Sequence, residues 1–485
     1  MKSIYKNIGL ILIILVGLTT VMSCSDYLDI NVAPDSPSDA QVTESVILPN
    51  VLAELSYELS GGYVARASSL WTAQIATTGE GRNISTLFLD DTDVNNTWQF
   101  SLYTGILKDA KLIEQKAIET GNTQYLGISK VIQAYGLSIV ADLWNEAPWS
   151  EAYDLEIIKP KFDTQEELYN SIDQLLEAAI TDIDSAITSG KIVYEDLLYN
   201  GDLNKWKKLA YSLRARFAMR LIYAKGDSQA DLVLLYASNG FTSNDDDAGF
   251  AFEDKEDANN PWVQWADKWT DVYINTFIVD LLGLNTDPRL DAYALNNRST
   301  QTITGAQNGT TIQSTSTSYV SIEKNLGTLN GQSYFMKNTS NIKWMSYSEL
   351  LFLVSEAYLF KQDAPNAQIN LRNAIKANLD ELASNGILAL TSTQIINFSD
   401  GFELPASFEN SQKMIIEQKY IANFLQIEPY NDYRRTGYPD IPLPVANYSS
   451  QIPERFPYGT NSILNNADNV PVVNYQTDKV WWDQK

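Results

Sequence analysis

Apolar residues recur at spacings of three and four over most of this chain, from about Val46 onward. Two clear examples are residues 128–139 and 168–183. This spacing places apolar side chains on one face of a helix, whereas strands alternate with a period of two. Similar stretches occur at residues 209–221, 346–360 and 407–424. The sequence therefore predicts an all-α fold, with a helical core over about residues 46–425.

Residues 346–377 resemble one helix–turn–helix unit of a tetratricopeptide array. Two segments with an apolar face, 349–357 and 367–374, flank a turn at residues 361–365. Such units bury their apolar faces only by stacking on neighbours, so one unit implies others. No clear period is visible elsewhere, and we expect any further repeats to be diverged.

Two long regions lack helical periodicity. Residues 296–332 are dominated by Ser, Thr, Asn, Gly and Gln, a composition that predicts exposed loops or a small hairpin. Residues 429–485 contain repeated prolines, which exclude a continuous helix. The aromatic residues of this C-terminal segment indicate that it packs on the helices. Because no flexible linker is visible, we predict a single domain over residues 24–485.

The N-terminus has the layout of a lipoprotein signal. Lys2 and Lys6 precede an apolar run at residues 8–18, which is shorter than the about 20 residues of a membrane-spanning helix. Cys24, the single cysteine of the chain, follows directly and resembles the acylated cysteine of a lipobox. We therefore predict a signal peptide over residues 1–23 and a lipid-anchored protein that does not span the membrane. An ordinary signal peptide cleaved nearby is the alternative.

The composition restricts the chemistry of the chain. There are 35 Lys and Arg against 60 Asp and Glu, a formal net charge of −25, which argues against binding nucleic acid. The sequence contains no histidine, and lipidation of Cys24 would remove the only thiol. We expect no enzyme, no metal and no cofactor. A glycoside hydrolase with two carboxylates and a pure helical-repeat scaffold are the alternatives from other classes.

Six segments together resemble the SusD/RagB family of nutrient-binding outer-membrane lipoproteins, and within it the second SusD-like subgroup. They are Cys24–Asn31, Asp142–Ala152, Tyr347–Ala357, Ile416–Ala422, Asp432–Pro439 and Ile452–Tyr458. In the second segment, Asn145 stands where the family usually has Gly and Trp149 where it usually has Tyr. The resemblance extends over nearly all of the chain after the signal.

This resemblance implies a SusD-like scaffold of tetratricopeptide-like helix pairs with long irregular ligand-binding loops. It also implies a partner, a SusC-like TonB-dependent transporter in the outer membrane, to which the lipoprotein delivers its ligand from the cell exterior. Ligands of the family are mostly oligosaccharides, and some members bind peptides. We expect an oligosaccharide, because aromatic side chains stack on sugar rings and this chain has 11 Trp and 27 Tyr.

Two segments combine aromatic and polar residues outside clear helical periodicity and are the candidate binding regions. The predicted ligand-binding residues are Arg82, Asn83, Asp91 and Trp98 in the first segment, and Trp262, Trp265 and Trp269 in the second. For the second segment an ordinary explanation is equally good, because positions 262, 265, 269 and 273 would lie on one buried helix face. Trp98 could likewise begin a helix through Leu102.

Three further motifs have structural explanations. The spacing of Asp91, Asp93 and Asn95 is similar to the start of a calcium-binding EF-hand loop, but the expected glycine and glutamate are missing. Residues 245–247, three consecutive aspartates, are interpreted as a solvated turn. Residues 434–435, two arginines, are interpreted as donors that fix loop carbonyls or carboxylates, with ligand contact as the alternative.

Overall fold

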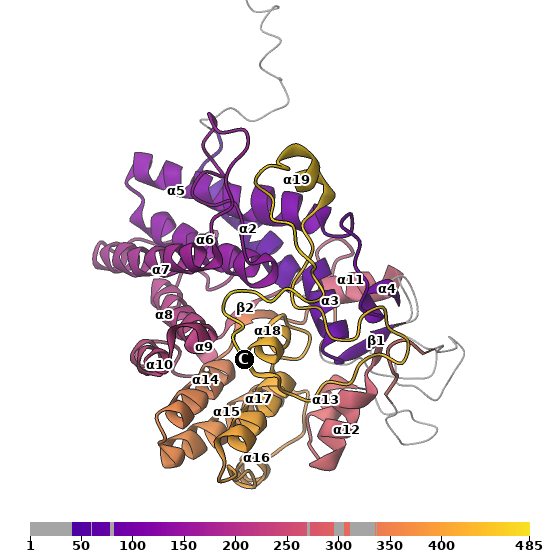
Figure 1. Ribbon diagram of the computed structural model, residues 1–485. Coiled ribbons are helices and arrows are strands. Elements are labelled where there is room, and N and C mark those ends of the chain that lie inside the picture. The colour runs from indigo at the N-terminus through magenta and orange to yellow at the C-terminus, as the bar shows by residue number, and fades with distance from the viewer. Residues whose placement is uncertain are drawn as a thin grey trace, which may run out of the picture. The chain divides into compact units, whose positions relative to one another are not determined.

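Helices make up most of the described chain, which confirms the all-α prediction (Figure 1). The computed structural model describes residues 41–59, 61–77, 82–268, 272–294, 305–310, 335 and 337–485. Cys24 and the predicted signal peptide lie outside these residues, so the lipid anchor stays a prediction. Met1–Thr43 and Glu44–Lys485 are separate units, and every helix and strand below belongs to the second.

A stack of long helices forms the scaffold (Figure 1). Its members are α5 Asp109–Thr120, α6 Thr123–Trp144, α7 Gln165–Thr188, α8 Leu203–Arg220, α10 Gln229–Ala237, α14 Tyr347–Phe360, α15 Ala364–Ser384 and α17 Phe408–Ala422. From α5 to α8 each helix packs on the next, then α8 on α10, α10 on α14, and α14 on both α15 and α17. Helices adjacent in the sequence are thus neighbours in space, as in a repeat array.

The other described helices complete the α-helical part of the fold. They are α2 Glu44–Leu59, α3 Tyr63–Trp71, α4 Arg82–Ser85, the π-helix η1 Asn96–Lys108, α9 Ile222–Lys225, the 3-10 helix η2 Asn244–Asp246, α11 Pro261–Lys268, α12 Thr276–Leu284, α13 Leu290–Tyr293, α16 Ser392–Asp400, α18 Glu428–Thr436 and α19 Thr460–Asn465. Two short antiparallel pairs complete the described elements: β1 Ile75–Thr77 with β3 Val272–Ile274, and β2 Ala248–Phe250 with β4 Ile342–Met345.

The predicted tetratricopeptide-like unit is present as the helix pair α14 and α15. Ser346 caps α14 by accepting a hydrogen bond from the Glu349 amide at 3.1 Å, and Asp363 caps α15 in the same way. Ser355 Oγ donates to the Ala367 carbonyl at 2.7 Å and joins the two helices. The turn, the caps and the inter-helix contact therefore all follow from the local sequence.

The helix α6 lies at the centre of the core. It is the only helix of the described ranges with the length and apolar composition to cross a membrane, and 89% of its most apolar stretch is buried inside the protein. Val131, Ile132 and Leu137 are completely buried. The apolar character of α6 is therefore explained by its contacts with η1, α5, α7 and α8.

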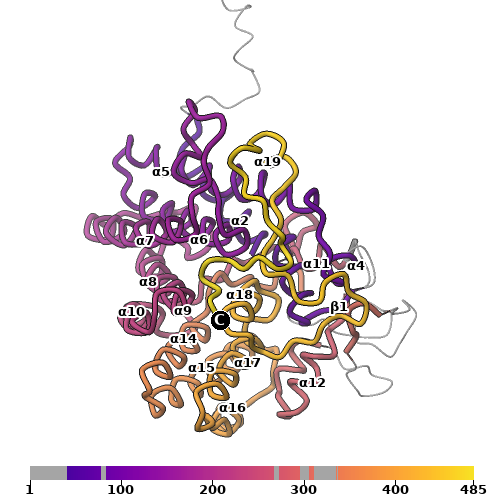
Figure 2. The backbone as a smooth tube through the Cα atoms, viewed as in Figure 1, coloured from indigo at the N-terminus to yellow at the C-terminus, as the bar shows by residue number. Residues whose placement is uncertain are grey.

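The C-terminal segment is more ordered than predicted. Helix α18 occupies residues 428–436, which the proline pattern assigned mostly to irregular chain, and α19 occupies residues 460–465. Pro429 lies in the first turn of α18, where its missing N–H has no helical partner in any case. Figure 2 shows the segment crossing the helices to α19 and returning to the C-terminus. Outside α18 and α19, residues 429–485 are irregular, as predicted.

Two other predictions need correction. The described part of the Ser- and Thr-rich region, residues 305–310, includes buried Ala306 and Asn308, so this part belongs to the core and is not an exposed loop. The three aspartates do not form a solvated turn. Asp246 is buried and paired with Lys208 at 2.8 Å, and the Asp247 carboxylate is paired with Lys343.

Candidate functional site

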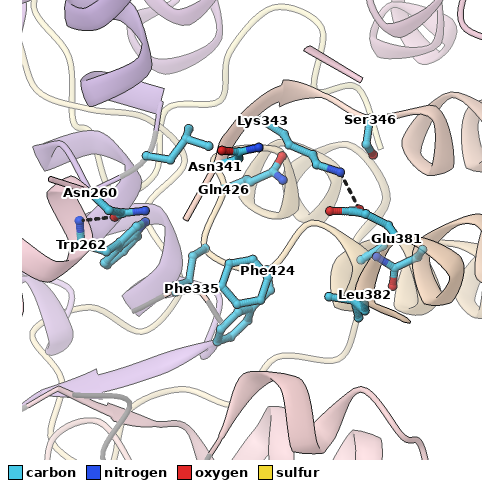
Figure 3. A pocket seen from close by; sticks show the side chains of 14 residues that line it. Asn260, Trp262, Phe335, Asn341, Lys343, Ser346, Glu381, Leu382, Phe424 and Gln426 are labelled. Atoms are coloured by element: carbon cyan, nitrogen blue, oxygen red, sulfur yellow. Dashed lines mark hydrogen bonds and ion pairs between the residues drawn. The ribbon is translucent and has the colours of Figure 1, made fainter. Parts of the chain in front are cut away.

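A cavity opens where α11, β4, α15 and the chain after α17 meet (Figure 3). The enclosed part is small, about 30 Å³ for the centre of a water-sized molecule, and the volume reaches about 570 Å³ only when the open mouth is counted. Asn260 and Trp262 come from the start of α11, Lys343 from β4 and Glu381 from α15. The wall of the cavity is therefore formed by α15 of the stack together with α11 and β4, which lie outside the stack.

Three aromatic rings line this cavity: Trp262, Phe335 and Phe424. Phe424 stacks on Tyr293 at 4.5 Å between ring centroids, with an interplanar angle of 7°, and Phe335 meets Phe424 edge to face at 5.2 Å. Figure 3 shows Phe335 and Phe424 together on one side of the cavity. Trp262 and Phe424 are each 1% exposed, so these rings shape a preformed wall and leave little of their own surface open to a ligand.

Amide side chains provide the polar part of the cavity. Asn260 is fixed, because its Oδ1 accepts from the Trp262 amide at 2.8 Å and its Nδ2 donates to the Ser340 carbonyl at 3.0 Å. Asn341 and Gln426 make no side-chain hydrogen bond within the described chain and retain donors and acceptors. These groups can therefore bind hydroxyl or amide groups of a ligand.

The Trp262 indole is the most restricted donor of the site. The residue is 1% exposed, and its Nε1 has no hydrogen-bond partner among the residues that the structure describes. An unsatisfied buried donor costs about 1–3 kcal/mol. A ligand acceptor at this position would recover part of that cost.

A fixed ion pair forms the charged edge of the cavity. Lys343 Nζ lies 2.5 Å from a Glu381 carboxylate oxygen and also contacts Asp247. Burial would lower the pKa of Lys343, but the attraction of Asp247 and Glu381 outweighs it, so this pKa lies above its ordinary value. Burial together with Glu381 raises the pKa of Asp247 to about 6. Lys343 therefore stays protonated and serves as a fixed cation and not as a base.

The structure places Trp262 and Trp265 side by side, at 5.7 Å between ring centroids. The Arg66 guanidinium lies 5.4 Å from the Trp265 ring centroid. Both tryptophans are buried, as expected for the core alternative, yet the helix ends at Lys268 and Tyr273 belongs to β3. A single helix face through residue 273 was therefore wrong, and Trp269 lies outside the described residues.

The first predicted segment is split between two places. Trp98 is buried against Trp144, at 5.0 Å between ring centroids, and Tyr458, at 5.8 Å. It lies in the first turn of η1, which agrees with the helix alternative. Asn83 and Asp91 are exposed, and the Asp91 carbonyl accepts from the Thr460 amide at 3.3 Å. These residues do not line the cavity of Figure 3, and their contact with a ligand stays untested.

The pairing of β1 with β3 nevertheless joins the two predicted segments. Thr77, the last residue of β1, is opposite Val272, the first residue of β3. The two candidate segments therefore meet the sheet at the same end. The backbone of Arg82 begins α4, and its side chain lies outside the described part of the structure. The sequence pattern alone gave no sign of this pairing.

Several residues of the cavity were not predicted from the sequence: Asn341, Lys343, Glu381, Phe424 and Gln426. They come from β4, α15 and the chain after α17, which are separated by tens of residues. Leu425 has a φ of +63°, which turns the chain between the Phe424 and Gln426 side chains. No local motif marks these positions, because contacts between segments distant in the sequence, among them α15 with α17 and β4 with β2, bring them together.

A helix-pair scaffold with an aromatic and amide-lined cavity defines an all-α protein suited to binding a small polar ligand. A family model described as "Starch-binding associating with outer membrane" matches residues 36–459, and the chain belongs to this SusD-like family. The family is one of nutrient-binding proteins associated with the outer membrane. A comparison with curated proteins finds no match.

Solved structures agree with this assignment. A SusD/RagB family protein from Bacteroides thetaiotaomicron is 26% identical, with a TM-score of 0.71 over 91% of this chain and 99% of that one. A chitin-binding SusD homologue from Flavobacterium johnsoniae is 22% identical, with a TM-score of 0.75 over 91% and 98%. A SusD homologue from Bacteroides fragilis is 20% identical, with a TM-score of 0.75 over 88% and 95%. These similarities confirm the SusD-like fold.

Proposed function

We propose that this protein binds an oligosaccharide at the cell surface and delivers it to a SusC-like TonB-dependent transporter. The lipid anchor on Cys24 would hold it on the outer membrane, facing the exterior. The observation that carries the proposal is the combination of Trp262 and Phe424 with amide side chains in one cavity. Family membership supports the same class of ligand, because the family is described as starch-binding.

The chemistry of the cavity favours a sugar over a peptide. Its one cation, Lys343, is already paired with the carboxylates of Glu381 and Asp247, so it offers little to a peptide carboxylate, whereas Asn341 and Gln426 match neutral hydroxyl or acetamido groups. One structural neighbour is described as chitin-binding. Starch and chitin fragments are therefore the first ligands to test, and a peptide is the alternative ligand.

Substitutions in the cavity test the assignment of the site. Phe424→Ala removes an aromatic wall and should weaken oligosaccharide binding by about tenfold. Leu284→Ala is the matched control, because Leu284 is 83% exposed on α12 and away from the cavity. Equal affinities of the two variants would contradict the site.

Delivery to a transporter needs a test in the cell. Deletion of the protein should abolish growth on the oligosaccharide that it binds, and the transporter should co-purify with the wild-type protein. Unchanged growth on every candidate nutrient would favour the pure scaffold alternative. Turnover of the glycan by the purified protein would instead favour the glycoside hydrolase.

A further inference from the structure

A second hollow lies at the opposite end of the β1–β3 pair from Thr77 and Val272. It encloses about 160 Å³ for the centre of a water-sized molecule, or about 590 Å³ counted out to its mouth, and it shares no lining residue with the cavity of Figure 3. Its walls come from the end of α3, the start of α12, residues 307–308 and residues 442–445. We call it the α12 groove.

One wall of the α12 groove is apolar and open to solvent. Phe277 is half-buried, while Leu443 is 42% exposed and Val445 is 67% exposed. Apolar side chains of this size are usually covered in a folded protein, so their grouping around a hollow favours a ligand surface. The wall offers an aromatic ring and aliphatic groups to one face of a ligand.

The chain that carries this wall is held in place. The Val445 amide donates to the Asn308 carbonyl at 3.0 Å. Gly309 has a φ of +77°, and a Cβ there would lie 2.5 Å from backbone atoms of Ala446, so only glycine allows this approach. The groove is therefore preformed and does not depend on a loose loop.

The polar part of the groove includes two hydrogen-bond acceptors, Asn308 Oδ1 and the Asp280 carboxylate, besides the Thr276 hydroxyl and the Gln307 carboxamide. Asn308 is 5% exposed, and its Nδ2 donates to the carbonyls of Leu70 at 2.9 Å and Ile75 at 3.1 Å. These two bonds fix the carboxamide, and its Oδ1 has no partner within the described ranges. Asp280 is exposed at the rim and makes no ion pair with any described residue. A ligand that donates hydrogen bonds could therefore satisfy Asn308 Oδ1 and Asp280.

We propose that the α12 groove is a second carbohydrate-binding site. One face of a sugar ring packs on Phe277 and Leu443, and its hydroxyls donate to Asn308 Oδ1 and the Asp280 carboxylate. A polyhydroxylated ring matches this combination, because its face packs on the apolar wall while its hydroxyls donate to a neutral carboxamide oxygen and to a carboxylate. The proposal rests on the proposed function, because it extends glycan binding to a second place on the same protein.

Titration of the purified full-length protein with a short chitin oligosaccharide and a short starch oligosaccharide tests the second site. The wild-type protein should bind one of them at two sites. Phe277→Ala and Asp280→Ala should each weaken one binding event by about tenfold and leave the other unchanged, whereas Phe424→Ala should do the reverse. Leu284→Ala, on the same helix α12 but outside the groove, should change neither.

The outcomes separate the two proposals. A single binding event that Phe424→Ala weakens and Phe277→Ala does not would overturn the second site and leave the proposed function standing. Binding of oligopeptides alone, with loss on Asp280→Ala, would show a peptide groove and overturn the sugar assignment. Absence of sugar binding at either place would overturn both proposals. Each variant should have the same midpoint of thermal unfolding as the wild type, which would show that a loss of binding is not a loss of fold.

Discussion

Arg435 and Glu356 form a two-point ion pair inside the protein. Arg435 Nη1 donates to Glu356 Oε1 and Nη2 to Oε2, both at 2.7 Å, and neither residue is more than 1% exposed. The pair joins α18 to α14, and Arg434 donates to the carbonyls of Asp142 and Glu454. The structural interpretation of the arginine pair is therefore supported, and both arginines lie in the last turn of α18.

Breaking this pair should destabilise the fold strongly. Glu356→Ala leaves the Arg435 guanidinium buried without its main partner and should lower the free energy of unfolding by about 3–5 kcal/mol. The control is Lys159→Ala, since Lys159 and Asp468 form a pair at 3.0 Å with 53% and 80% exposed side chains. That variant should lose at most about 1 kcal/mol. Urea unfolding measures both, and equal losses would contradict the role of the buried pair.

Glu58 should make stability depend on pH. Burial, with a smaller contribution from Glu54, raises the pKa of Glu58 to about 7 against an ordinary value of 4.5. Between these two values the folded protein binds more protons at Glu58 than the unfolded chain, so the free energy of unfolding falls as pH rises through this range. The free energy of unfolding of Glu58→Gln, relative to that of the wild type, should therefore rise by about 3 kcal/mol from pH 4.5 to pH 8.

Urea unfolding at several pH values between 4.5 and 8 measures this difference. Glu256→Gln is the matched control, because Glu256 is exposed and should give a difference that does not vary with pH. A pH-independent difference for Glu58→Gln would mean that Glu58 is already ionised in the folded protein near pH 5.

At Asn145, strain in the backbone lowers the stability of the fold and a side-chain hydrogen bond raises it. Its φ of +72° and ψ of −72° form a γ-turn closed by the Glu146 amide on the Trp144 carbonyl at 3.0 Å. Its Oδ1 accepts from the Trp481 amide at 2.6 Å. Asn145→Ala keeps the strain and loses the bond, whereas Asn145→Gly loses the bond but relieves the strain.

The alanine variant should therefore be less stable than the glycine variant by about 1 kcal/mol. Denaturant midpoints of the two variants, measured under identical conditions, give this difference directly. Equal midpoints would show that the positive φ at this position carries no cost. A glycine would adopt this positive φ without steric cost.

The helical scaffold could be predicted because its signals are local. Periodicity identified α6, α7, α8, α14 and α17. Helix α18 was missed because Pro439 and later prolines dominated the pattern, although Pro429 at its start is compatible with a helix. Local signals thus gave the helix pairs but not every boundary.

The candidate site could be predicted only in part, because it depends on contacts between distant segments. Trp262 was expected from composition, yet its neighbours Lys343 and Phe424 belong to β4 and to the chain after α17. Trp98 had the same composition around it and is packed on Trp144 instead. Composition cannot distinguish an aromatic ring that lines a cavity from one that fills the core.

A calorimetric titration of the purified protein tests the central claim most directly. Starch and chitin oligosaccharides are titrated in parallel with oligopeptides of similar length, each against the wild type and Phe424→Ala. We predict saturable binding of an oligosaccharide to the wild type, weakened in the Phe424→Ala variant, and no heat of binding with the peptides. Saturable binding of the peptides with no binding of any oligosaccharide would contradict the account.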